Sequence, residues 1–337
     1  MYSLIFLIGS CAQITSLNLK KHQFGKIPTK IIWFQVAGFS TEHLAMLKFT
    51  GPAKPGETAF EESLCVGQAW DYNLYKLRPS AQETFLTQVS GKKNIKRNCT
   101  DYKHKPIWSY LGLKGYKSGV FEGESYKAQS ILSSQSCKDE GEGFLKDAIV
   151  WKMGKSSKKS KIFHVNEKNS YKAGSIYYDK SCKSGECFTT SSRNIENTFK
   201  SFSKNTRNFV YVVRNFQYRN YLQANKFKEA KAELIEINSA IKKMQEFAKL
   251  HSDALVLVTT ADVKELNFPK SGKEWRRFER YTKSIKTVNT KLVSNVYATG
   301  ARAENFCGVY NQNNILSRIF SGAKQQGLEF SIINPFE

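Results

Sequence analysis

Cysteine side chains are the first candidates for chemistry in this chain. Cys182 and Cys187 are separated by only four residues, and Gly185 permits the tight turn that a local disulfide needs. Zinc is the alternative occupant of this pair, although no second Cys or His pair stands nearby at ligand spacing. Six of the seven cysteines lie beyond Cys11, and an even number favours disulfides in an oxidising compartment. Which pairs form is left open for the other four: Cys65, Cys99, Cys137 and Cys307.

The first residues resemble an export signal. A short apolar run, Leu4 to Ile8, is followed by Gly, Ser and Cys11, as in bacterial lipoproteins that are acylated on this cysteine. No Lys or Arg precedes the run, so the alternatives are a buried first strand or a truncated start. We expect residues 1–20 to be a leader and tether, and the protein to be exported, periplasmic or anchored as a membrane lipoprotein of a bacterium.

The charge of the chain is strongly positive. Its 337 residues include 52 Lys+Arg and 29 Asp+Glu, a formal charge of +23. Such an excess creates a long-range field that attracts anionic lipid, lipopolysaccharide-like surfaces, nucleic acid or phosphorylated small molecules. The lysines are spread along the whole sequence, so a solvated basic surface without a specific partner is the alternative. The sequence contains no run of eighteen apolar residues, so it predicts no transmembrane helix.

Buried strands and amphipathic helices must position any site. Nearly continuous apolar runs predict buried strands over 30–37, 209–213, 254–261 and 292–298. Apolar residues at helical spacing predict a helix over 227–251 and another over 313–323. Such an alternation predicts a parallel sheet covered by helices on both faces.

The middle of the chain has a different composition. Residues 136–204 are rich in Lys, Ser, Gly and Asn, which predicts an irregular basic insertion. Within it, Trp151 to Lys161 is expected to be an exposed loop, or alternatively a basic tether for an anionic partner.

Four stretches resemble the alkaline phosphatase family. Residues 240–262 resemble the family's helix ending in "EFAKK" and strand "TLVIVTADH", and residues 297–315 resemble its "AYGPGAENFTGVYDNTDI". Residues 30–39 match its first strand and "GDG" turn, and residues 112–121 match its "GYSTGVV" strand. The resemblance covers residues 28–325 in the family's order. It implies one α/β domain, a three-layer sandwich in which helices flank a mostly parallel central sheet.

The family's chemistry makes a specific demand on its residues. A hydroxyl nucleophile attacks the phosphomonoester while two zinc ions about 4 Å apart stabilise the attacking and leaving oxygens. Zinc needs His and carboxylate ligands, and a nearby magnesium ion needs hard oxygen ligands. Members of the family are often dimers, so the resemblance also implies a dimer.

Several ligand positions of the family carry unsuitable residues here. In the "GDG" turn, Ala37 replaces the bridging Asp. In the stretch that resembles "EGGxIDxxxHxN", Arg214 and Arg219 replace acids and Gln223 replaces a His. Two guanidinium groups would repel zinc, yet they could bind phosphate or carboxylate bidentately.

The remaining ligand positions follow the third predicted strand. Asp262 is retained in the "TADH" motif, but Val263 replaces its His, and Asn289 stands where the last His ligand is expected. The chain has only five His, none near these motifs except His251, for which a core or capping role is expected. The other four are His22, His43, His104 and His164.

The nucleophile region is also altered. Residues 79–92 resemble the family's "DSAxxxTAxxTGxK". Counting back from Gly91 places Ala81 on the nucleophile, whereas one inserted residue places Ser80 there. The preceding Asp is missing in both alignments.

A second basic feature follows Asp262. The segment from Lys264 to Lys286 could form an amphipathic helix. One face would carry Trp275, Phe278 and Thr282, and the opposite face would carry the basic residues. This pattern suits an anionic lipid surface or polyanion, or alternatively an ordinary surface helix docked by its aromatic residues.

The residues together predict a protein that is not an enzyme. We expect an exported, non-catalytic member of the phosphatase scaffold, without zinc, magnesium or another cofactor, that binds an anionic ligand, a phosphate group or an anionic membrane surface. One alternative is a residual metal-dependent phosphomonoester hydrolase that uses Ser80. A second is a structural or adhesion protein without a small-molecule site.

Overall fold

The main sheet has ten strands, of which one runs against the others. The computed structural model describes residues 26–49, 58–156, 160–164, 170–183, 186–271, 273–275, 287–288 and 291–321. The strand order is β14-β2-β13-β10-β1-β9-β3-β4-β6-β5. Both neighbours of β13 pair with it antiparallel, and all other pairs are parallel. The predicted fold class, a mostly parallel sheet between helices, is confirmed.

The four predicted strands are present. The strand expected over 292–298 is β13, and its antiparallel direction is the one departure from the predicted parallel arrangement. Two two-stranded ribbons, β7–β8 and β11–β12, lie outside the main sheet. The strand bounds are β1 Lys30–Ala37, β2 Cys65–Trp70, β3 Lys117–Glu122, β4 Ala148–Lys152, β5 Lys161–Phe163, β6 Ile176–Asp179, β7 Cys182–Lys183, β8 Glu186–Cys187, β9 Phe209–Asn215, β10 Ala254–Ala261, β11 Glu265–Leu266, β12 Thr287–Val288, β13 Val293–Gly300 and β14 Gly308–Asn311.

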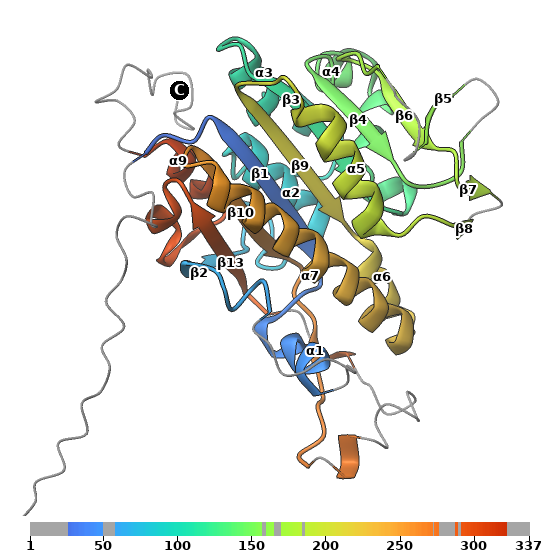
Figure 1. Ribbon diagram of the computed structural model, residues 1–337, viewed down its shortest axis with the longest axis vertical. Helices are drawn as coiled ribbons and strands as arrows, with labels where there is room; N and C mark the ends of the chain where they lie inside the picture. The colour runs from blue at the N-terminus through green and yellow to red at the C-terminus, as the bar shows by residue number, and fades with distance from the viewer. Residues whose placement is uncertain are drawn as a thin grey trace, which may run out of the picture.

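Helices cover both faces of the sheet. Helices α5 (Ser191–Ser203), α6 (Gln217–Gln223) and α7 (Phe227–Leu250) lie on the face toward the viewer of Figure 1, and α2 (Ala81–Ser90) lies behind the sheet. Helices α3 (Ile107–Gly112) and α9 (Asn314–Phe320) share the core of α2. Two further helices, α1 (Ala45–Phe49) and α4 (Lys138–Gly141), are short. The predicted helices correspond to α7 and α9, and His251 caps the C-terminus of α7 as expected.

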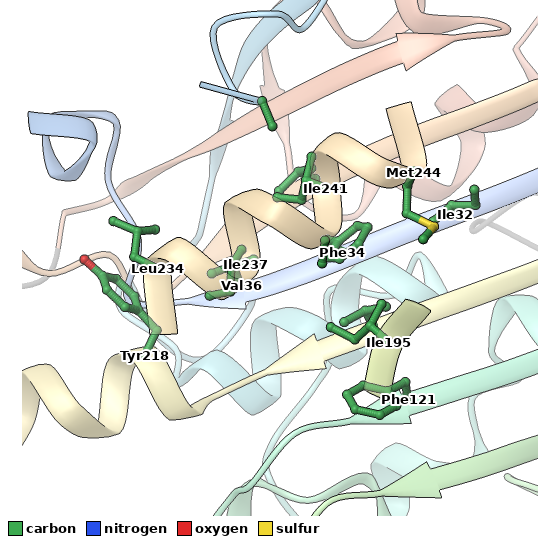
Figure 2. Packing of buried hydrophobic residues seen from close by; sticks show 14 of the residues in the cluster. Ile32, Phe34, Val36, Phe121, Ile195, Tyr218, Leu234, Ile237, Ile241 and Met244 are labelled. Carbon is green, nitrogen blue, oxygen red and sulfur yellow. The ribbon is translucent and has the colours of Figure 1, made fainter. Parts of the chain in front are cut away.

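Strand β1 separates the two halves of the core. Its even-numbered residues Ile32, Phe34 and Val36 pack toward α7, where Ile237, Ile241 and Met244 line the facing side (Figure 2). Its odd-numbered residues Ile31 and Trp33 join the second cluster, with α2, α3 and α9. Burying one such side chain contributes roughly 1.5–3 kcal/mol, so this strand stabilises both layers.

The middle segment is more regular than its composition predicts. Residues 136–204 contain α4, α5 and the strands β4, β5 and β6, which join the main sheet. Trp151, expected in an exposed loop, is fully buried in β4. The prediction of an irregular insertion was therefore wrong for most of this segment. Strands of three to five residues are too short to show a periodic pattern.

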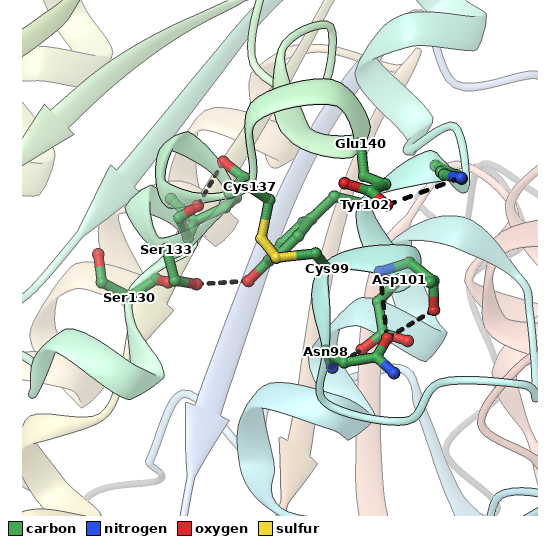
Figure 3. The surroundings of a disulfide bond; sticks show 12 residues. Asn98, Cys99, Asp101, Tyr102, Ser130, Ser133, Cys137 and Glu140 are labelled. Carbon is green, nitrogen blue, oxygen red and sulfur yellow. Dashed lines mark hydrogen bonds and ion pairs between the residues drawn. A yellow bond between two sulfur atoms is a disulfide. The ribbon is translucent and has the colours of Figure 1, made fainter.

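Disulfides join all six cysteines beyond Cys11. The pairs are Cys65–Cys307, Cys99–Cys137 and Cys182–Cys187, so the predicted local pair is confirmed. The bonded sulfurs of Cys182 and Cys187 offer no thiolate to zinc, although Asp179 lies beside them. In Figure 3 the Cys99–Cys137 bond ties the turn at Cys99–Lys103 to the segment leading into α4, and Tyr102 hydrogen-bonds Ser133 beside it.

Some predicted features fall outside the described residues. Among them are the leader at 1–20 with Cys11, residues 276–286 of the basic segment, and Asn289. The described part of that segment holds β11 and, over residues 273–275, helical backbone; the ring of Trp275 stacks on Phe268 at 5.7 Å. Among the described helices, none has the length and apolar character needed to cross a bilayer.

Candidate functional site

The predicted site lies at the carboxyl edge of the sheet. Strands β1, β9 and β10 are parallel neighbours, so their last residues and the loops that follow meet at one edge. Ala37 ends β1 and is paired with Ala261, which ends β10. In open α/β sheets, ligands bind outside this edge. The sequence therefore places the candidate residues where a site would be expected.

Asp262 is held by two cations. Its Oδ2 accepts a hydrogen bond from Nε of Arg219, and its Oδ1 lies 2.8 Å from Nζ of Lys264. Arg219 also donates from Nη1 to Oε1 of Gln223 at 2.8 Å. Three predicted positions, Arg219, Gln223 and Asp262, thus form one hydrogen-bonded group. The carboxylate that a metal would need is occupied by a guanidinium and an ammonium group.

Local backbone geometry fixes this group. Gly38 has φ +82°, and a Cβ on it would lie 2.8 Å from Cβ of Arg219. The loops after β1 and β10 are joined by bonds from the Gly38 N–H to the Ala261 carbonyl, 2.8 Å, and from the Lys264 N–H to the Gly38 carbonyl, 3.1 Å. Asp262 itself adopts a left-handed conformation, with φ 49°, which is uncommon for residues other than glycine. The turn therefore brings the Arg219 stem directly against the end of β1.

Arg214 belongs to a second, deeper group. Its Nη1 lies 2.9 Å from Oε2 of Glu122 on the neighbouring strand β3, and its Nη2 donates to Oε1 of Gln82. The other oxygen of Glu122 lies 2.7 Å from Nζ of Lys152 on β4. Ser130 also donates to Glu122. All of these side chains are buried.

The charges of this second group are mutually stabilised. Burial alone would raise the pKa of Glu122, but Lys152 and Arg214 hold it below its usual range. Burial lowers the pKa of Arg214, and the Glu122 carboxylate opposes that shift. Glu122 is therefore ionised and committed to its partners. Each of the two groups combines one carboxylate with two cations, which leaves an excess of positive charge at this edge.

Apolar side chains fill the space between the strand ends and α2. A separate cluster of five buried residues contains Ala37, Ala81, Phe85, Phe216 and Ala261. The rings of Phe85 and Phe216 are 5.3 Å apart, edge to face. Apolar packing therefore brings together two predicted positions. These are Ala37, which replaces the bridging Asp, and Ala81, one of the two candidate positions of the nucleophile. Neither side chain can bind a metal or attack phosphorus.

Ser80 serves as a helix cap. It is the N-cap of α2, and its Oγ lies 2.7 Å from Oε2 of Glu83 and accepts from the Glu83 N–H. The Glu83 carboxylate lies 2.8 Å from Nζ of Lys76. Capping of this kind stabilises a helix by about 0.5–2 kcal/mol. The Ser80 hydroxyl is thus used within its own turn.

Val263, Asn289 and His251 are the remaining positions named from the sequence. Val263 is fully buried. Asn289 lies outside the described residues. His251 is the C-cap of α7, where its ring stacks on Phe247.

Two buried groups near the site were missed from the sequence. Asp71, after β2, is bonded by Ser294 and Gln312, and burial raises its pKa to about 7, with Asp262 contributing in the same direction. His43 is fully buried, and its Nδ1 lies 2.8 Å from the Tyr218 hydroxyl. Burial lowers its pKa to about 3, so the imidazole is neutral. Neither residue stands in a recognisable motif, and only the fold brings them near the site.

The described residues do not fit a two-zinc centre. Zinc takes His nitrogen, thiolate or carboxylate ligands, and a site needs at least three from the protein. The side chains bonded to Asp262 are instead guanidinium and ammonium groups. The nearby Asp71 carboxyl is already bonded by Ser294 and Gln312. The His43 imidazole is bonded to the Tyr218 hydroxyl. Glu122 is committed to two cations. A magnesium site meets the same obstacle, since it needs several hard oxygen ligands.

A cavity lies away from this edge. It has a volume of about 920 Å³ and opens near Lys117 and Ser118, which begin β3, with Tyr102 and Phe144 in its walls. Because β3 is parallel to β1, this cavity is at the amino edge of the sheet, opposite Asp262. It is therefore no substrate pocket for the predicted site.

Comparison with known proteins identifies the fold. No protein-family model matches the sequence, and no curated protein sequence matches it. Alkaline phosphatase from the Antarctic bacterium TAB5 has a similar structure, with a TM-score of 0.64, 16% identity, and coverage of 89% of this chain and 99% of that one. The cold-active alkaline phosphatase of the psychrophile Shewanella sp. gives a TM-score of 0.68 with 14% identity, covering 87% and 99%. Alkaline phosphatase from Thermus thermophilus gives 0.67 with 10% identity, covering 94% and 95%. The chain therefore has the alkaline phosphatase fold.

Proposed function

We propose that this chain is an exported, non-catalytic protein on the alkaline phosphatase fold, whose metal centre has been replaced by ion pairs and apolar packing. The observation that carries the proposal is the state of Asp262. The one acidic ligand that the sequence retains is bound by Arg219 and Lys264. A zinc ion would have to displace both cations. It would also have to break the bonds that hold the nearby Asp71 carboxyl and His43 imidazole.

Export is supported by the covalent structure. Three disulfides are formed among the described residues, and structural disulfides persist in oxidising compartments. The signal-like start with Cys11 agrees with this location. A periplasmic or lipid-anchored protein of a bacterium is consistent with both.

Anion binding at this edge depends on Arg219 and Lys264. Arg214 is fully buried and both of its terminal nitrogens are used, so it stabilises the fold rather than a ligand. The side chains of Arg219 and Lys264 remain 14% and 12% exposed, and together they carry one positive charge more than Asp262. A phosphate or carboxylate group could bind there beside Asp262.

The experiment tests catalysis and anion binding separately. Purified protein is analysed for zinc and magnesium, and turnover of p-nitrophenyl phosphate is measured with and without added zinc. The proposal predicts no stoichiometric metal and no turnover. Zinc at two ions per chain with turnover abolished by Asp262→Asn would overturn it in favour of a residual hydrolase.

Anion binding is measured by thermal melting with increasing phosphate. Phosphate is expected to raise the melting temperature of the wild type and of Arg207→Ala, which loses the same charge at an exposed position. The rise is expected to vanish in Arg219→Ala, with each variant compared with its own phosphate-free value. Equal rises in all three proteins would remove anion binding from the proposal and favour a structural or adhesion role.

A further inference from the structure

We propose that two adjoining surface segments, Tyr72–Arg78 and Lys92–Arg97, form a docking surface for an anionic lipid bilayer. We call these two segments the cationic platform. The inference uses none of the residues that form the Asp262 group and does not depend on the absence of catalysis.

The platform displays large apolar side chains to solvent. Leu74, Tyr75 and Leu77 are 66%, 51% and 73% exposed, although they lie within four consecutive residues. Single exposed apolar residues are ordinary, but a group of this kind needs a reason. A loop tip with two leucines and a tyrosine is suited to the boundary between headgroups and acyl chains.

Every exposed charge on the two segments is positive. Between residues 72 and 98 the sequence has one acidic residue, Glu83, which is 1% exposed and paired with Lys76. Asp71, just before the platform, is also buried. The cations are Lys76, Arg78, Lys92, Lys93, Lys96 and Arg97. Clustered Lys and Arg beside an apolar tip are attracted to anionic headgroups.

The structure holds the two segments side by side. The Leu74 N–H donates to the Lys93 carbonyl at 3.1 Å, and the Asn73 amide donates to the Ile95 carbonyl at 3.0 Å. Oδ1 of Asn73 accepts from the N–H groups of Tyr75 and Lys76, both at 2.8 Å. The turn that presents the leucines is therefore preorganised, and binding needs little ordering of the backbone.

Cations and rings also alternate on this surface. Nζ of Lys93 lies 4.8 Å from the ring centre of Tyr72, and Nζ of Lys96 lies 4.9 Å from that of Tyr75. The ammonium groups are thereby kept next to the apolar tip. A bilayer uses both features at once, whereas nucleic acid would use the cations and leave the leucines in water. The exposed leucines thus favour lipid over other polyanions.

The test uses vesicles of phosphatidylcholine with and without phosphatidylglycerol. All proteins carry Cys11→Ala, so that acylation cannot contribute to binding. The wild-type platform is expected to bind the anionic vesicles only, with affinity that falls as salt rises. Leu74→Ser/Leu77→Ser and Lys93→Gln/Lys96→Gln are each expected to weaken binding about tenfold.

Matched controls carry the same changes elsewhere. Leu113→Ser/Leu250→Ser removes two leucines that are 75% and 83% exposed, and Lys226→Gln/Lys228→Gln removes two exposed lysines. Both controls are expected to bind within about twofold of the wild type. Platform variants that bind like the wild type would overturn the proposal. So would binding that depends on the lysines but not on the leucines, which would indicate a soluble polyanion.

A spectroscopic measurement does not depend on affinity. In Tyr75→Trp, the added indole is expected to gain blue-shifted emission, relative to the unsubstituted protein, when anionic vesicles are added. The equivalent substitution Leu113→Trp should gain none. A Tyr75→Trp signal that stays unchanged on vesicles that bind the protein would place the contact elsewhere and refute the platform.

Discussion

Glu122 on β3 and Arg214 on β9 are register partners whose side chains form a 2.9 Å ion pair inside the protein. Arg214 occupies a position that resembles a metal-ligand position of the phosphatases, and the carboxylate that it binds comes from the neighbouring strand. The positive charge that a metal ion would supply at such a position is thus supplied here by the Arg214 guanidinium group.

Glu122→Gln should destabilise the protein strongly. The substitution leaves Arg214 and Lys152 buried without their carboxylate, and breaking a buried pair costs about 3–5 kcal/mol. Urea unfolding followed by circular dichroism measures the loss. Glu142→Gln, at an exposed position, should change stability by less than about 0.5 kcal/mol. In the double variant Glu122→Gln/Arg214→Met the two losses should be less than additive; strict additivity would show that the pair is not coupled.

Gly38→Ala should destabilise the turn that places Arg219. The added Cβ would need a left-handed backbone and would contact Arg219 Cβ at 2.8 Å. Gly115→Ala is the matched control, because Gly115 has φ +77° with nothing within 4 Å of an added Cβ. Both variants should lose about 1–2 kcal/mol from the backbone. Gly38→Ala should lose about 1–3 kcal/mol more from crowding, measured by urea unfolding. Equal losses would contradict the tight contact.

The sequence indicated the parts of the site that follow predicted strands. Arg219, Gln223 and Asp262 were named from motif positions, and they do form one hydrogen-bonded group. Glu122 was not predicted, because its partner Arg214 is 92 residues away and meets it only through strand pairing. Apolar runs and helical spacing are local signals, whereas ion pairs between strands depend on their order in the sheet.

The same limit explains the error in the middle segment. Strand β4 is five residues long and entirely buried, yet a Lys/Ser-rich stretch follows it. Its burial comes from pairing with β3 and β6, which composition cannot reveal.

The three disulfides should stabilise the protein in order of the loops that they close. The bonded residues are 242, 38 and 5 positions apart for Cys65–Cys307, Cys99–Cys137 and Cys182–Cys187. Loop entropy predicts losses of about 5, 4 and 2 kcal/mol when each pair is replaced by alanine. Guanidinium unfolding of the three double variants gives the comparison. A larger loss for Cys182–Cys187 than for Cys65–Cys307 would show that local strain or packing outweighs chain entropy.

Asp71 should make stability fall as pH rises. Its pKa is raised to about 7 in the folded protein and is about 3.9 in an unfolded chain. Between these values the folded state binds more protons than the unfolded state, so this group's contribution to the unfolding free energy decreases from about pH 4 to pH 7 and then levels off. Urea unfolding across this range should show the decrease in the wild type relative to Asp71→Asn. Asp139→Asn, at an exposed residue, should retain the wild-type slope; the same slope in Asp71→Asn would contradict the assignment.

The bond between Cys65 and Cys307 has a consequence for the products of proteolysis. It joins β2, near the start of the folded domain, to the residue before β14, near its end. A protease that cuts one peptide bond anywhere between these cysteines therefore releases no fragment, because both pieces stay covalently attached. The nicked molecule can keep its sheet assembled until a reductant opens that bond, so reducing and non-reducing gels of protease-treated protein would differ.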